Sequence, residues 1–92
     1  MPVSSPQSTL ATLLDLVEEL GIAVRRVPSA GDSDEHPGGA IVRLKGKEIL
    51  MLDPTASLAD QMSAAVAALR GRKEMEERFL TPEIRALLDA ED

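Results

Sequence analysis

The residues best suited to chemistry lie in one acidic segment, which holds the chain's single histidine. Asp32, Asp34 and Glu35 come just before His36. An imidazole beside carboxylates could bind a metal ion weakly or act as a general base. The two aspartates also hint at an EF-hand calcium loop, but Arg43 stands where that loop needs its last glutamate. A metal-dependent binder that uses the His36 segment is therefore the alternative function.

Other catalytic patterns are missing from the sequence. The serines form no Gly-x-Ser-x-Gly elbow, and only His36 could serve as their base. The Lys45-Gly46-Lys47 run lacks the glycine spacing of a phosphate-binding loop, and it lies between two apolar runs rather than before a helix. We expect no catalytic residue, no cofactor and no resident metal, and we lean against an enzyme.

Composition narrows the class of protein. The 92 residues suffice for a single domain over 1–92, and 43% of them are hydrophobic, with one Phe and no Trp or Tyr. A net charge of −6 makes the chain acidic and argues against binding to nucleic acid or to an anionic membrane. The absence of cysteine and of an apolar leader within the first residues predicts a cytoplasmic location.

A β-hairpin over residues 38–53 is the predicted centre of the fold. Two aliphatic runs, Ala40–Leu44 and Glu48–Leu52, flank a turn that could be Lys45-Gly46 or Gly46-Lys47. Because side chains alternate along strands, both turns give the same two faces. The face expected to meet the core carries Ala40, Val42, Leu44, Lys47, Ile49 and Met51. The second face carries Ile41, Arg43, Lys45, Glu48, Leu50 and Leu52.

The remaining elements follow from caps and apolar periods. Ser5-Pro6 predicts the start of a first helix, with Ser8 as an alternative cap, and Gly21 predicts its end. The run Ile22–Val27 is typical of an edge strand that extends the hairpin to three antiparallel strands. Residues 29–38 are predicted to be a flexible loop.

The C-terminal half is predicted to be helical. Ser57 should cap a second helix that ends near Arg70, and residues 72–77 should form a connector or a further helical turn. Thr81-Pro82 should begin a short last helix. The predicted fold class is α+β, a small three-stranded antiparallel sheet with helices, in the order α-β-β-β-α-α.

Two family resemblances follow from these patterns. Gly21-Ile22-Ala23-Val24 before a glycine-containing loop, and then the run 41–47 before a helix, resemble the N-terminal part of ImmA/IrrE-type metallopeptidases over roughly residues 8–70. That family carries His-Glu-x-x-His on the helix after the hairpin. Residues 57–69 contain no histidine, so no catalytic residue is carried over. The alternative function is therefore a metal-dependent binder or a degenerate metallopeptidase-like domain that uses the His36 loop. The chain is more similar still to short bacterial proteins of about this length, a likeness that implies no activity.

The second face of the hairpin suggests an interaction surface. Three aliphatic residues, Ile41, Leu50 and Leu52, should cluster there beside a basic tip formed by Arg43, Lys45 and Lys47. Either the C-terminal helix covers this cluster, through Phe79, Ile84, Leu87 and Leu88, or another chain does. We predict a small non-catalytic protein-interaction module that binds a protein partner or forms a weak homodimer through Leu50 or Leu52.

Overall fold

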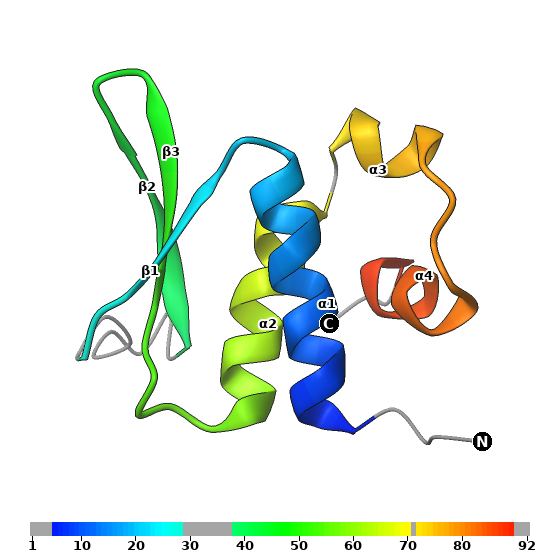
Figure 1. Cartoon of the computed structure of the whole chain (residues 1–92), viewed down its shortest axis with the longest axis horizontal. Coiled ribbons are helices and arrows are strands. Elements are labelled where there is room, and N and C mark those ends of the chain that lie inside the picture. Colours follow the sequence, from blue (N-terminus) through cyan, green and yellow to red (C-terminus); the bar gives the residue numbers. More distant parts are fainter. Residues whose placement is uncertain (1–4, 29–37, 71, 90–92) are drawn as a thin grey trace.

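The computed structural model describes residues 5–28, 38–70 and 72–89 (Figure 1). In chain order the elements are α1 (Pro6–Glu19), β1 (Ala23–Arg26), β2 (Gly39–Leu44), β3 (Lys47–Leu52), α2 (Leu58–Leu69), α3 (Lys73–Glu77) and α4 (Pro82–Asp89). The fold is α+β with a three-stranded sheet, as the sequence predicts. The region for which a connector or a helical turn was expected forms the short helix α3.

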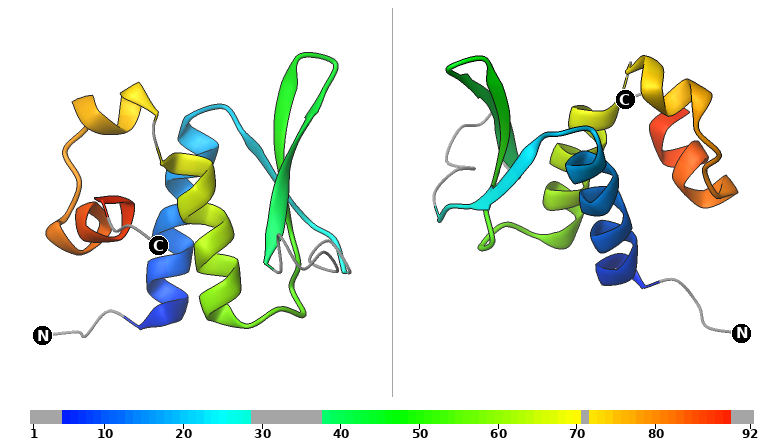
Figure 2. Two further views of the ribbon diagram at one scale, coloured as in Figure 1. Left: turned by 180° about the vertical axis from the view of Figure 1, so that it is seen from behind. Right: turned by 45° about the horizontal axis from the view of Figure 1, so that its top comes forward.

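The elements are arranged in layers (Figures 1 and 2). Helices α1 and α2 lie side by side against one face of the sheet, and α3 and α4 lie beyond them, on the side away from the sheet. The helix pair is therefore covered on two sides. Helix α1 contributes Leu10, Leu13, Leu14, Leu16 and Val17 to the buried core.

The sheet is mixed, so the prediction of three antiparallel strands was wrong. Strand β3 lies in the centre, antiparallel to β2 and parallel to β1. The hairpin itself is confirmed: Leu44 pairs with Lys47, and positive φ values of 53° and 79° at Lys45 and Gly46 identify the two turn residues. The central place suits β3 because it is the most continuously apolar strand, and a central strand exposes least of itself.

The grouping of the hairpin side chains into two faces was predicted correctly. However, the face that was expected to meet the core is exposed, and the other face is buried. Leu50 and Leu52 are each 1% exposed beneath the helices, and Ile41 packs against the same core. On the face expected to be buried, Val42 and Leu44 are 40% and 59% exposed. The aliphatic side chains alone could not decide between the faces, because both faces carry three or more large ones.

Caps place the ends of the two long helices as predicted. The Ser5 and Ser57 hydroxyls accept hydrogen bonds from the third residue after each, at 3.1 Å in both helices. At the end of α1, Gly21 has a φ of 85°, and the Ile22 amide donates to the Val17 carbonyl at 3.3 Å. This reversed turn is the Schellman motif, and it directs the chain from α1 straight into β1.

The C-terminal helices pack differently from the prediction. Ile84 and Leu88 of α4 are buried as expected, yet they contact the helix pair and not the sheet. Phe79 was expected to anchor this region, but it is 90% exposed. Contacts across the layers include a hydrogen bond of 3.1 Å from Thr9 to Glu83 and an ion pair between Arg78 and Glu19.

The entry into β2 depends on a glycine. Gly38 is buried, and a side chain there would overlap the backbone carbonyl of Asp60 in α2. The Gly38 carbonyl accepts a hydrogen bond of 3.0 Å from the Asp53 amide just after β3. Gly38 therefore belongs to the packed structure, whereas residues 29–37 of the predicted flexible loop lie outside the described residues.

The exchange of faces leads to a stability prediction. Leu50→Ala should lower the free energy of unfolding by about 2–5 kcal/mol, because it leaves a cavity beneath the helices. Val42→Ala, on the opposite face, should cost no more than about 1 kcal/mol. Chemical denaturation of both variants measures the difference. A larger loss for Val42→Ala would mean that the core lies on the other side of the sheet.

Candidate functional site

The face of the sheet turned away from the helices is the candidate site, and we call it the open face. Strand alternation and register place on it Ala23, Arg25, Ala40, Val42, Leu44, Lys47, Ile49 and Met51. The register sets these residues in cross-strand rows, with Ile49 between Ala23 and Val42, and Met51 between Arg25 and Ala40. No element among the described residues covers this face (Figure 1).

The open face is apolar at its centre. Val42 and Leu44 are exposed, and Ile49 and Met51 between β1 and β2 are half-buried. A hollow of about 360 Å³ lies at the end near the turn, where Leu44, Ile49 and Ala23 contribute its apolar wall. Solvated sheet faces usually carry polar side chains, so this composition is typical of a surface that another molecule covers.

The charge on the open face has one sign. Arg25 and Lys47 are exposed, and both line the hollow together with Lys45 of the adjacent turn. Glu48 also lines the hollow, but its carboxylate is paired with Arg72 on the helix side. Neither Arg25 nor Lys47 forms an ion pair with a carboxylate of the described residues. The backbone register gives the face two cations and no anion, although the whole chain carries a charge of −6.

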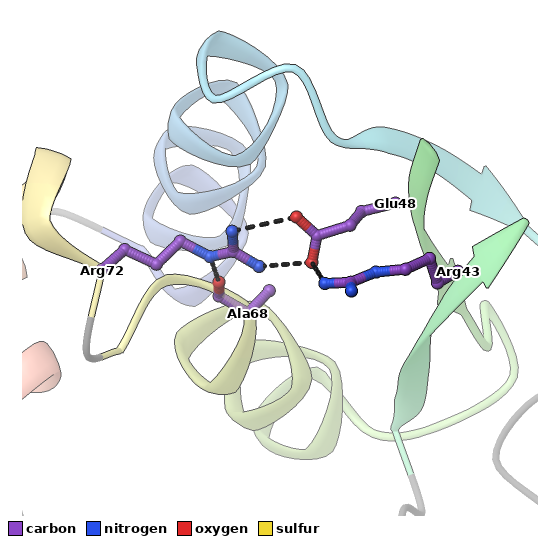
Figure 3. A network of polar contacts seen from close by, with 4 residues as sticks. All are labelled: Arg43, Glu48, Ala68 and Arg72. Atoms are coloured by element: carbon purple, nitrogen blue, oxygen red, sulfur yellow. Dashed lines mark hydrogen bonds and ion pairs between the residues drawn. The ribbon is translucent and has the colours of Figure 1, made fainter. Parts of the chain in front are cut away.

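A network of ionic contacts on the opposite side holds the hairpin against the helices (Figure 3). The Arg72 guanidinium, just after α2, donates two hydrogen bonds to the Glu48 carboxylate, at 3.1 and 2.8 Å. Its Nε donates a third to the Ala68 carbonyl at 2.6 Å. Arg43 approaches Glu48 to 3.9 Å but is 75% exposed. Two parallel hydrogen bonds fix the guanidinium and the carboxylate in one plane, which positions the tip of the hairpin.

This network changes the ionisation of Glu48. The hydrogen bonds from Arg72 hold the pKa of the Glu48 carboxyl below its ordinary value; partial loss of solvent opposes this effect, and the charges of Arg72 and Arg43 add to it. The same hydrogen bonds raise the pKa of Arg72 further. The pair is therefore fully charged near neutral pH.

The predicted interaction surface is only partly available. Leu50 and Leu52 are buried in the chain's own core, and Ile41 is half-buried against it, so none of the three forms an open patch. The predicted homodimer contact through Leu50 or Leu52 was therefore wrong. Its cover is the helix pair, and not the C-terminal helix that was the expected alternative.

The basic part of the predicted surface does lie on the outside. Arg43, Lys45 and Lys47 are all exposed at the tip of the hairpin, although Arg43 points to the helix side with Glu48. The residues missed were Val42, Leu44, Ile49 and Met51, which had been assigned to the core. A signal for them was available in Lys47, which shares their face and would have had to be buried with them.

The alternative site around His36 falls outside the described residues, together with Asp32, Asp34 and Glu35. Within the part of the chain that the structure describes, no three His, Cys, Asp or Glu side chains come together as metal ligands. None of the described helices is both long and apolar enough to cross a membrane.

Comparisons with known proteins do not assign a function to this site. No protein-family model matches the chain, and neither the curated proteins nor the solved structures contain a significant match. The resemblances to metallopeptidases and to short bacterial proteins stay predictions.

The Glu48 ion pair predicts a pH dependence of stability. Because the folded-state pKa is lowered, the charged carboxylate stabilises the fold above the ordinary glutamate value of about 4.3, and this contribution is lost as the pH falls through the folded-state pKa. Glu48→Gln should therefore show a smaller fall in the free energy of unfolding between about pH 6 and pH 3. Urea denaturation across this range measures it.

The matched control is Glu76→Gln on α3. Glu76 is exposed and makes no ion pair with a described residue, so its removal should leave the pH dependence close to that of the unaltered chain. If Glu48→Gln and Glu76→Gln gave the same curve, the contact with Arg72 would contribute nothing to acid stability.

Proposed function

We propose that the protein is a small non-catalytic protein-interaction module that uses the open face of its sheet. The observation that supports this proposal is the exposure of Val42 and Leu44 on an apolar sheet face that no described element covers. All the described helices are gathered on the other face (Figure 2). A partner that covers the open face would complete the layer that the chain itself does not supply.

The surrounding structure suits a binding surface. The two glycine-free strands β1 and β3 hold their side chains in fixed rows, and the Arg72–Glu48 contact positions the hairpin from behind. A rigid surface loses little conformational entropy when it binds, which favours affinity. The exposed aliphatic centre with a charged rim is also the usual anatomy of a protein interface.

Site-specific photo-crosslinking tests the proposal. A photoreactive amino acid in place of Val42 should give a protein adduct of defined mass in the cells that naturally make the chain. The same probe in place of Ala11, which is exposed on α1, should give none. Leu44→Lys, in the chain that carries the Val42 probe, should abolish the adduct, because it puts a charge into the apolar centre of the face.

Circular dichroism and thermal melting establish that each variant is folded. Leu44 is 59% exposed, so the lysine side chain can remain in water and the fold should be preserved. An adduct that persists in the Leu44→Lys chain, or one that forms equally at Ala11, would contradict a specific role for the open face.

A further inference from the structure

We infer that the natural occupant of the open face is an acidic amphipathic helix of another protein. This inference rests on the proposed function and specifies the chemistry of its partner. Among the described residues, the open face combines apolar side chains with cations, and the only carboxylate beside it is that of Glu48, which is paired with Arg72 from behind, in a chain that is otherwise strongly acidic. The complementary surface must therefore combine large apolar side chains with carboxylates.

The distance between the cations of the open face sets the distance between the carboxylates of the partner helix. Arg25 lies beside Met51, and Lys47 lies four residues before Met51 along β3. At about 3.3 Å per residue, the backbone positions of the two cations are about 13 Å apart along the strand direction. Both residues line the same hollow. A helix rises about 1.5 Å per residue and repeats its side about every seven residues, so a helix that follows β3 would meet both cations with carboxylates about seven residues apart, roughly 11 Å along its axis.

The side chains between the cations specify the rest of the helix. Val42 and Ile49 lie between the rows of the two cations, and Leu44 lies beside Lys47, so the partner should present apolar residues at the three-and-four spacing between and beside its carboxylates. A strand added at the edge of β2 would pair with its backbone but would leave these apolar side chains uncovered. The exposed rows of side chains therefore favour a helix that lies across the face.

A second copy of the chain is a poor complement to the open face. Two open faces placed together would bring the Arg25 and Lys47 side chains of both copies close to one another. The described helices expose no large hydrophobic side chain, since the exposed ones are Val42, Leu44 and Phe79. Phe79 lies in the connection between α3 and α4, at the far end of the molecule from the sheet, so its docking on a second open face would not close into a dimer (Figure 1).

A designed peptide tests the inference with the full chain. The probe is an amphipathic helix of about 18 residues with leucines on one side and two glutamates about seven positions apart at the border of that side. The control peptide carries lysines in place of both glutamates. Amide chemical shifts of the isotope-labelled protein should change along β2 and β3 with the acidic peptide, with a Kd below about 1 mM, and not with the basic one.

Charge-reversal variants identify the contacts. Arg25→Glu combined with Lys47→Glu should weaken binding of the acidic peptide at least roughly fivefold, since two attractive contacts become repulsive. Lys73→Glu is the matched control, because Lys73 is exposed on α3, in the layer away from the sheet, and it should change the affinity less than about twofold. The affinity for the acidic peptide should also fall as salt is added.

The outcomes separate this inference from the proposed function. Binding by the acidic peptide that depends on Arg25 and Lys47 would support both. Equal binding of the two peptides, or binding by neither while the Val42 probe still gives its adduct, would overturn the acidic helix and leave the interaction module standing. Light scattering that shows a dimer abolished by Val42→Lys would overturn the inference in favour of a second copy.

Discussion

Burial of Leu50 and Leu52 under the α1–α2 pair is the constraint on which the rest of the structure depends. These two side chains are almost completely excluded from solvent, and they lie on the central strand. Because aromatic residues are nearly absent, the chain must stabilise itself by aliphatic packing of this kind. Both long helices are needed for that cover, and the described C-terminal helices cover the helix pair in turn. The other side of the sheet is left to solvent or to a partner.

Local signals in the sequence predicted local structure well. The serine caps, the glycine that ends α1, the Lys45-Gly46 turn and the alternation of side chains each depend on residues within a few positions of one another. The side of the sheet that the helices would cover was not available locally. One decisive contact joins Glu48 to Arg72, which lies 24 positions later in the chain. This contact pairs the charge of Glu48, which lies on the face that the helices cover.

The strand order was unpredictable for a related reason. A run of three strands suggests a meander in which each strand pairs with the next, and that rule led to the antiparallel prediction. The structure instead inserts β3 between β1 and β2, which gives the most apolar strand two neighbours. The exchange of the two faces also affected the candidate site. Its cations were placed correctly on the outside, but its apolar residues were taken from the face that the helices bury.

The two faces of the sheet are linked energetically, because alternate residues of the same strands form both. Ile49 and Met51 face outward while Leu50 and Leu52 between and beyond them hold the helices, so a partner on the open face would clamp the strand that organises the core. A ligand that binds only the folded chain stabilises it by mass action. In a chain of this size, whose core is limited, the open face can therefore serve recognition and stability together. In the proposed complex, the cations on that face would decide which partner is accepted, since the apolar side chains alone would not discriminate between helices.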